Sequence, residues 1–219
     1  EKIVSDHHIA MPARVAAWRA FYEKANRRPL LGFFLGSEYP IPRYPYAASL
    51  PDDRPIVPDD FDAATHARAE ALLFEAHEDC GGYCIHAGSA YWGVPWLEAL
   101  MGCEIRASHT TGSLYAVPLA ETPAEAPADF GSAGDRWTPR PFDPQASWAA
   151  LAAEMLSASA DESAGRFPLA TTRMRGVADM LAAVFGGEDL IMAMLDRPDE
   201  VHRLAGMLTD LYIEFGRHQ

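Results

Sequence analysis

The sequence predicts an α/β fold, namely the N-terminal half of a (β/α)8 TIM barrel with helices preceding its first strand. Two observations predict it. Short apolar runs alternate along the chain with stretches of helical periodicity, a pattern typical of a parallel sheet with crossover helices. The chain of 219 residues holds roughly four such units, about half of the number that closes a barrel. A complete doubly wound domain is the alternative fold.

Short apolar segments are the predicted strands. They lack a helical period and are bounded by turn residues, as the buried strands of parallel sheets are. These segments are residues 28–36, 83–88, 113–119 and 167–172. In a barrel the carboxyl ends of the strands meet at one face, so polar residues that follow these segments are the first candidates for a site.

Helices are predicted where apolar residues recur three and four positions apart. Those stretches are residues 12–26, 61–79, 94–102, 145–163, 177–187, 188–197 and 198–219, with Asp60 or Asp62 as the N-cap of the second. Residues 37–60 are rich in proline, and residues 120–144 are rich in proline, glycine and alanine. Both are predicted as loops without regular structure, the first of them carrying function.

Composition excludes several classes of partner. The formal net charge of -13 argues against a nucleic-acid partner, although a few local arginines can still serve a small anion. No apolar run is long enough to cross a bilayer, and no apolar signal-peptide region follows Glu1. Three cysteines are too few for a disulfide scaffold. We therefore expect a cytoplasmic protein without membrane or nucleic-acid partners.

The two ends of the sequence look cut. There is no initiator methionine, and the chain stops inside the helical pattern of residues 198–219 without a C-capping glycine. We expect residues 1–219 to be a single incomplete domain whose C-terminal half is missing.

A cluster of histidine and cysteine is the weak candidate for a metal site. Cys80, Cys84 and His86 lie within one short window together with His77. Thiolate and imidazole are the ligands that zinc prefers. The spacing matches no closed structural zinc site, and the alternative interpretation is that these are small buried residues beside a strand.

Three further segments combine aromatic and basic residues. Arg43 and Tyr44 belong to the loop after the first predicted strand, and Trp92 follows the second, where it offers a flat apolar wall or simply packs under a helix. Arg173 and Arg175 follow the fourth predicted strand, with one residue between them. These arginines indicate an anion site; the alternative is an ion pair between Arg175 and Asp179 at a helix start.

Two motifs resemble those of the uroporphyrinogen decarboxylase family. "VPWLEALMGCEI" is similar to that family's Pro-Leu-Glu-Ala-x-Gly helix, and "FPLATTRMRGVADMLAAVFGGED" is similar to its fourth-strand segment. "RRPLLGFFLGSEYPIPRY" stands where the first strand and its ligand-binding loop are expected. The resemblance implies a barrel enzyme whose relatives include zinc- and corrinoid-dependent methyltransferases.

The sequence also departs from the family's pattern. True decarboxylases carry an Arg-Gln-Ala-Gly-Arg-Tyr signature after the first strand, whereas this chain has "LGSEYPIPRY", which leaves Arg43 and Tyr44 as equivalents. The family's aspartate near the end of the second strand has no acidic counterpart in "HAGSAYWG". Binding a polycarboxylate needs cationic partners, and protonating a pyrrole needs an acid. The resemblance therefore implies a divergent enzyme in which methyl transfer to a corrinoid or thiol is favoured over decarboxylation.

The resemblance also implies cofactors, partners and a set of site residues. A methyltransferase would use zinc and a corrinoid, with a corrinoid protein as partner, whereas a decarboxylase (a carboxy-lyase) would need no cofactor. The third alternative is a barrel that binds a ligand without catalysis. The substrate is expected to be a small anionic or tetrapyrrole-like molecule, and the general acid or base is not identified. The predicted substrate-binding residues are Arg43, Tyr44, His86, Tyr91, Trp92, Thr172, Arg173 and Arg175.

Overall fold

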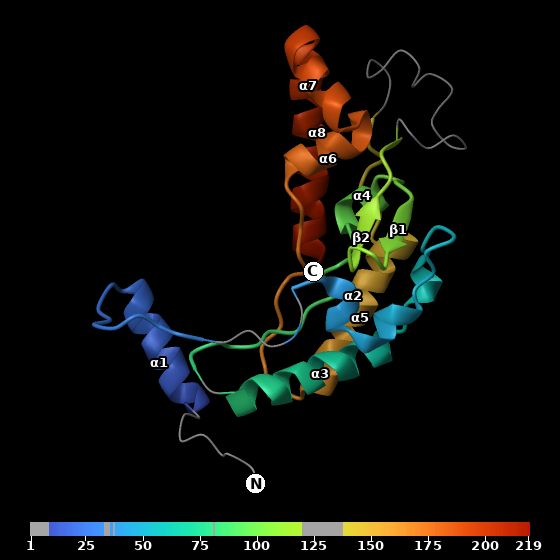
Figure 1. The fold of residues 1–219 in the computed structure, drawn as a ribbon. Coiled ribbons are helices and arrows are strands. Elements are labelled where there is room, and N and C mark those ends of the chain that lie inside the picture. The colour runs from blue at the N-terminus through green and yellow to red at the C-terminus, as the bar shows by residue number, and fades with distance from the viewer. Residues whose placement is uncertain (1–8, 33–35, 37, 81, 120–137) are drawn as a thin grey trace.

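Helices form most of the regular structure in the computed structural model, which describes residues 9–32, 36, 38–80, 82–119 and 138–219 (Figure 1). The α-helices there are α1 (Met11–Tyr22), α2 (Pro40–Arg43), α3 (Ala63–Cys80), α4 (Trp96–Leu100), α5 (Ser147–Ser163), α6 (Val177–Phe185), α7 (Gly187–Asp196) and α8 (Pro198–His218). The 3-10 helices are η1 (Pro45–Ser49) and η2 (Pro58–Asp60), and the strands are β1 (Ile105–Ser108) and β2 (Ser113–Ala116).

The predicted half of a TIM barrel is wrong. The sheet in the described part of the chain is an antiparallel pair, β1 with β2, in which Ile105 lies opposite Ala116 and Ser108 opposite Ser113. Among the described residues of the four predicted strands, only residues 113–119 contain one, and its partner β1 was not predicted. The doubly wound alternative fails for the same reason, because both folds need a parallel sheet.

The other predicted strands make isolated bridges instead of ladders. Gly88 bridges Leu169 in parallel: its N–H donates to the Pro168 carbonyl at 3.0 Å, and its carbonyl accepts the Ala170 N–H at 2.9 Å. Gly32 bridges Gly82 in the antiparallel sense, and residues 33–35 lie outside the described ranges. Glycine lowers strand propensity and proline removes a ladder donor, so these apolar runs stay extended without forming a sheet.

The helical predictions are confirmed, with shifted ends. The predicted helices correspond in order to α3 to α8; α3 ends one residue after its predicted range and α7 begins one residue before its own. The predicted ranges are residues 61–79, 94–102, 145–163, 177–187, 188–197 and 198–219. The Thr65 N–H donates to Oδ1 of Asp62 at 2.6 Å, so Asp62 caps the start of α3. The helix predicted over residues 12–26 ends at Tyr22, and Lys24 then takes a positive φ of 56°.

Both predicted loops need qualification. Within residues 37–60 the structure has α2, η1 and η2, each of which opens with a proline. Proline suits the first turn of a helix because its fixed φ is already helical and its missing N–H would have had no partner there. The prediction that these prolines forbid regular structure is therefore wrong. Of residues 120–144, the part up to 137 lies outside the described ranges, and residues 138–144 form no helix or strand.

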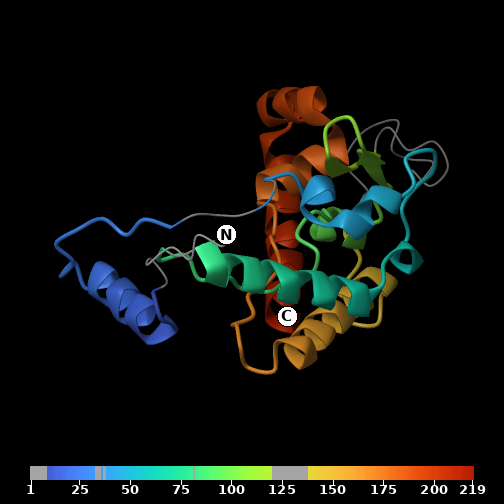
Figure 2. The ribbon, with the colours of Figure 1, turned by 60° about the horizontal axis from the view of Figure 1, so that its bottom comes forward.

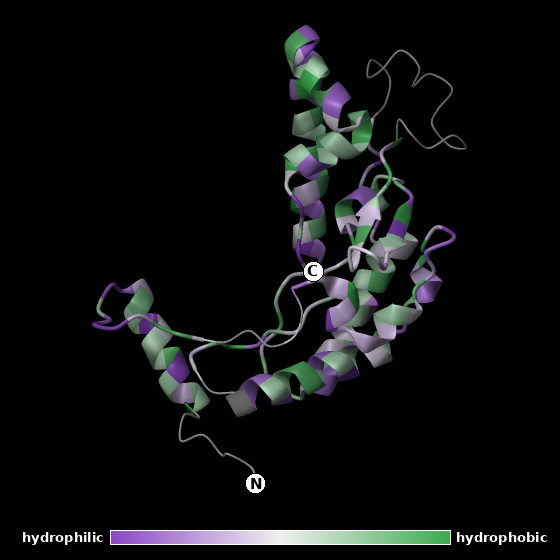
Figure 3. Cartoon of the chain, in the orientation of Figure 1, coloured by the Kyte–Doolittle hydropathy of each residue, from purple (hydrophilic) through white to green (hydrophobic). Residues whose placement is uncertain are grey.

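The core lies between the long helices. α3 packs along α5, and α6 and α7 pack against α8, with α4 between the two groups (Figures 1 and 2). Trp96, Met155, Met180, Leu204 and Phe215 are among its fully buried side chains. Hydrophobic and hydrophilic bands alternate along α8, as expected for a helix with one face on a core (Figure 3). No helix in the described ranges has both the length and the apolar character needed to span a membrane.

Helix α1 stands apart from this core in both views (Figures 1 and 2). Its Arg14 is fully buried, forms an ion pair with Glu78 of α3, and donates to the Cys84 carbonyl at 3.3 Å. The Trp18 indole N–H donates to the Tyr83 carbonyl at 2.7 Å. These two side chains hold α1 against the end of α3.

Candidate functional site

A pocket of about 500 Å³ lies where α2 and α3 meet the extended segments before α4 and α6. We call it the Glu70 pocket. It is lined by Glu38, Arg43, Tyr44, Glu70, Ile85, His86, Ala87, Ser89, Trp92, Ala170, Thr171 and Arg173. An adjoining pocket of about 430 Å³, the Arg175 pocket, shares Glu38, Trp92 and Arg173 with it. Five of the predicted substrate-binding residues therefore meet in the Glu70 pocket.

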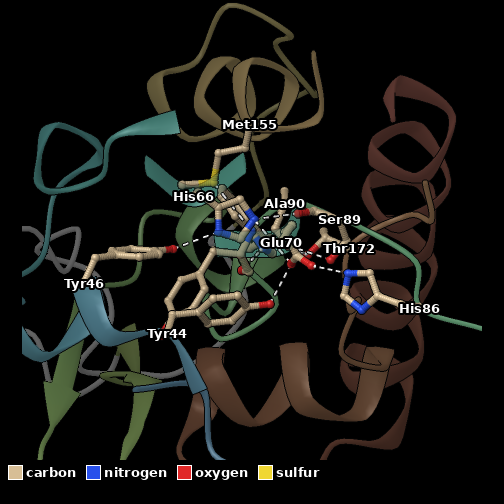
Figure 4. Close-up of polar contacts among 11 residues, drawn as sticks. Tyr44, Tyr46, His66, Glu70, His86, Ser89, Ala90, Met155 and Thr172 are labelled. Carbon is tan, nitrogen blue, oxygen red and sulfur yellow. Dashed lines mark hydrogen bonds and ion pairs between the residues drawn. The ribbon is translucent and has the colours of Figure 1, made fainter. Parts of the chain in front are cut away.

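A buried carboxylate on α3 organises the Glu70 pocket (Figure 4). The Tyr44 hydroxyl donates to Oε1 of Glu70 at 2.6 Å, and Nε2 of His86 lies 2.9 Å from Oε2. Tyr44, Glu70 and His86 are each at most 5% exposed. Because Nε2 faces a carboxylate oxygen, Nε2 is the ring nitrogen that carries a proton, and Nδ1 is left for other partners.

The protonation states in this group follow from burial and hydrogen bonding. Burial alone raises the pKa of Glu70, but the hydrogen bond from His86, the neighbouring His66 imidazole and the hydrogen bond from Tyr44 lower it by more. The net pKa of Glu70 lies below its ordinary value, so Glu70 is a carboxylate at neutral pH. Burial, with the nearby Glu70 charge, raises the pKa of Tyr44 far above its ordinary value, which keeps its hydroxyl a donor.

His66, one helical turn before Glu70, belongs to a second chain of hydrogen bonds (Figure 4). Its Nε2 donates to the Ser89 carbonyl at 2.7 Å, and its Nδ1 accepts from the Tyr46 hydroxyl at 2.8 Å. Burial lowers the pKa of His66, so the ring is neutral. Both nitrogens are engaged within the protein, and His66 therefore positions the segment around Ser89 rather than acting on a ligand.

Two guanidinium groups border the Glu70 pocket. Cζ of Arg173 lies 5.7 Å from the centroid of the Trp92 ring, and Arg173 forms no ion pair with any described residue. Arg43 is 7% exposed, and its Cζ lies 5.8 Å from the centroid of the Tyr44 ring. An exposed cation stacked on an indole, with a second cation at the pocket wall, suits an anionic ligand that has a flat part.

Two of the predicted substrate-binding residues do not line either pocket. Tyr91 is fully buried, and its ring packs on Tyr44 with centroids 5.1 Å apart. Thr172 is 2% exposed, and its hydroxyl donates to the Ala90 carbonyl at 3.0 Å. Both residues stabilise the segments that carry the pocket, and Thr171 lines it in place of Thr172.

Arg175 lies in the adjoining Arg175 pocket. Its Nη2 is 3.2 Å from Oδ1 of Asp179, which confirms the predicted ion pair at the start of α6. Its Nη1 is 3.1 Å from Oε1 of Glu98, a fully buried carboxylate on α4. Burial raises the pKa of Glu98, and Arg175 offsets part of this effect. Arg175 is therefore already engaged by two carboxylates, unlike Arg173.

The candidate metal ligands do not assemble into a site. In the described part of the chain no three side chains of histidine, cysteine, aspartate or glutamate come together around a possible ion position. The side chain of Cys80 lies outside that part. The centroids of the His77 and His86 rings are 5.3 Å apart, but Nδ1 of His77 hydrogen-bonds the Leu73 carbonyl and Nε2 of His86 faces Glu70.

Sequence reasoning missed Glu70 and His66. Both lie on the predicted helix of residues 61–79, and with Leu73 and His77 they form a stripe at helical spacing. This stripe was the signal that could have found the site. It places a carboxylate and two imidazoles on one face of a helix that must bury a face, and buried polar side chains need partners.

Comparisons of the chain with family models, with curated proteins and with solved structures give no match.

Proposed function

We propose that this chain is an enzyme that binds a small anionic substrate in the Glu70 pocket and exchanges a proton with it through His86. One observation carries the proposal. The buried Glu70–His86 pair and the Arg173–Trp92 stack line the same pocket. A proton-transfer group and an anion-binding group therefore lie within reach of one ligand.

The Glu70–His86 pair has the arrangement that general acid–base catalysis needs. Nε2 of His86 lies 2.9 Å from Oε2 of Glu70, and this contact holds the ring beside the carboxylate with Nε2 towards it. Nδ1 is then the ring nitrogen that takes a proton from the ligand or gives one to it. Tyr44 donates to the other carboxylate oxygen and so fixes Glu70 in turn.

The pocket wall defines the class of substrate. Arg173 and Arg43 supply positive charge, and the indole of Trp92 supplies a flat apolar surface. Guanidinium groups bind carboxylates through paired N–H donors. We infer an aromatic or conjugated substrate that carries carboxylates.

Among the candidate reactions, we propose decarboxylation as the one that the residues of this pocket favour. A uroporphyrinogen decarboxylase-like reaction needs a proton donor and cationic partners for the carboxylates. In the Glu70 pocket His86, oriented by Glu70 of α3, is the proposed proton donor, and Arg43 and Arg173 are the proposed cationic partners. In such a step the carbon–carboxylate bond breaks, CO2 leaves, and the electron pair stays on carbon. His86, which has first taken up a proton from solvent at Nδ1, gives that proton to the carbon and returns to its neutral form. The fold that the resemblance implied is not part of this proposal.

The first experiment separates binding from turnover. Uroporphyrin, an aromatic octacarboxylate, is titrated into the protein while its visible absorption is recorded. We expect saturable binding that Arg173→Gln weakens about tenfold, since a charge-assisted pair is lost. Arg140→Gln, at a separate small pocket, is the matched control and keeps the wild-type affinity. A folded wild-type protein that binds no polycarboxylate contradicts the proposal.

Turnover is then measured with uroporphyrinogen, by counting the carboxylates of the product. His86→Gln is expected to retain binding and lose turnover. The same preparations are tested for methyl transfer from a methylated corrinoid to a thiol, the reaction that the resemblance also implies. If the protein methylates the thiol and does not decarboxylate uroporphyrinogen, methyl transfer replaces decarboxylation as the proposed reaction. Binding without turnover in either assay would favour a ligand-binding protein.

We also propose a reducing compartment such as the cytoplasm. Cys103 is a buried thiol that forms no disulfide with a described residue, and burial raises its pKa to about 12. Thiols persist in reducing compartments, whereas secreted proteins tend to pair them.

A further inference from the structure

Helix α7 carries an exposed apolar surface, which we call the α7 face. It consists of Ile191, Met192, Met194 and Leu195, whose exposed fractions are 61%, 54%, 48% and 73%. The opposite side of the helix is buried through Leu190 and Ala193, which pack on the core. Large apolar side chains this exposed on consecutive turns indicate an interaction surface.

A second exposed apolar surface lies at the N-terminal end of the described chain. We call residues 11–31 the N-terminal arm; its exposed apolar side chains are Val15, Phe21, Tyr22 and Leu31, with exposed fractions of 45%, 44%, 77% and 67%. Aromatic residues supply large contact areas at protein interfaces. The arm therefore has the composition of the centre of an interface.

The two surfaces carry opposite charge. The exposed acids beside the α7 face are Glu188, Asp189, Asp196 and Asp199. The exposed cations of the N-terminal arm are Arg19, Lys24, Arg27 and Arg28, with Glu23 as its exposed acid. The arm is thus a basic element in a chain of net charge -13. An apolar centre with a rim of one charge matches an apolar centre with a rim of the opposite charge.

The surfaces cannot meet within one molecule. α1 and α7 lie well apart in both views (Figures 1 and 2). α1 is held in place through the buried Arg14–Glu78 pair and through the hydrogen bond from Trp18 to the Tyr83 carbonyl. Complementary surfaces that one molecule cannot bring together can be satisfied by a second copy of that molecule.

We propose that the N-terminal arm of one copy of this chain docks on the α7 face of a second copy. Such a contact joins two different surfaces, so it either closes into a symmetric dimer with two such contacts or extends into longer assemblies. A membrane surface would suit the basic arm, but it would leave the apolar α7 face with its acidic rim uncovered.

The first test is the association state of the full chain, measured by sedimentation velocity over a range of protein concentrations. We expect self-association that weakens in 1 M salt, where the Debye length falls to about 3 Å. Leu195→Asp is expected to raise the dissociation constant about tenfold or more. Ile213→Asp, a matched change at an exposed apolar position of α8, leaves it unchanged. Both positions are exposed, and circular dichroism checks that both variants fold.

The second test is a charge exchange. Arg19→Glu with Arg27→Glu in one protein, and Asp189→Lys with Asp196→Lys in another, should each weaken self-association. Mixing the two proteins should restore association, because the altered arm then meets the altered rim. A wild-type chain that stays monomeric at every concentration overturns the proposal. So does a mixture that fails to associate, or an arm that binds anionic lipid vesicles while the chain remains monomeric.

Discussion

Nε2 of His86 lies 2.9 Å from Oε2 of Glu70, and both side chains are almost fully buried. The Tyr44 hydroxyl donates a hydrogen bond to the other carboxylate oxygen, Oε1, at 2.6 Å. One carboxylate therefore orients an imidazole and a phenol that come from segments on either side of α3 in the sequence. Changing Glu70 should affect the orientation of His86 and the stability of the pocket at the same time.

Glu70→Gln tests this relationship. The amide keeps the shape of the side chain but offers only one acceptor oxygen, so either Tyr44 or His86 loses its partner. We expect a loss of about 1–3 kcal/mol in the free energy of unfolding, and about 10- to 100-fold lower turnover because His86 is no longer held. Urea denaturation and the decarboxylation assay measure the two effects. Glu75→Gln, an exposed change on the same helix, is the control, and equal behaviour of the two variants would contradict the assignment.

His66 gives the protein a pH-dependent stability. Burial lowers its pKa in the folded state below the ordinary value of 6.5, so the unfolded chain binds a proton that the folded chain does not. Stability should therefore fall as the pH drops from about 7 towards 5, by up to about 1.4 kcal/mol per pH unit. His77, whose pKa is also lowered chiefly by burial, contributes in the same direction. Urea denaturation at several pH values should show a shallower slope for His66→Gln, and an unchanged slope would exclude His66 as the cause.

Glu70 contributes to stability at lower pH. Its folded-state pKa is below the ordinary value of 4.5, so its stabilisation is present above that value and is lost as the pH falls through the folded-state pKa. Acid unfolding of the wild type should therefore be steeper below about pH 4.5 than that of Glu70→Gln. Parallel curves would mean that the carboxylate is not held as an anion.

The helices could be predicted from the sequence because their signal is local. Asp62 caps α3, Pro198 opens α8, and apolar residues recur at helical spacing in both. The sheet could not be predicted in the same way, because an apolar run such as residues 83–88 does not specify a partner. Gly82, just before this run, and Gly88, at its end, each make a single bridge, and a ladder would have needed a longer uninterrupted strand.

The site was predictable where residues follow one another along an extended segment. Trp92 and Arg173 were found because they follow apolar runs, and they do meet, with the guanidinium over the indole. Glu70 was missed because it lies within a helix, where a carboxylate is ordinarily taken to face solvent. Which helical face is buried depends on α5, whose packing against α3 is a tertiary contact.

Arg175→Gln should lower the free energy of unfolding, because Glu98 then stays buried without its cation. Glu98 is fully buried, and Arg175, whose side chain is 40% exposed, is the cation beside it. Removing that cation leaves a buried carboxylate without charge compensation. We expect a loss of about 1–2 kcal/mol at pH 8, less than for a fully buried pair because water screens Arg175.

The pH dependence of this variant follows from the raised pKa of Glu98. Below the folded-state pKa the carboxyl is protonated and no longer needs Arg175, so the loss should shrink as the pH is lowered from 8 to 5. Glu98→Gln combined with Arg175→Gln should recover most of the stability at pH 8. If the single and the double variants unfold at the same urea concentration, Glu98 is not the cause.

Gly93→Ala should disturb the pocket through backbone packing. A Cβ at this position would lie 2.4 Å from Cβ of Pro40, closer than any relaxed contact, so one of the two segments must move. Pro40 opens α2, which also carries Arg43. We expect a loss of about 1–3 kcal/mol in stability, together with weaker ligand binding because Arg43 shifts with α2. Gly206→Ala in α8 meets nothing within 4 Å and should instead gain about 0.5–1 kcal/mol from helix propensity. Urea denaturation compares the two variants, and if they respond alike, the contact between Gly93 and Pro40 does not fix the position of α2.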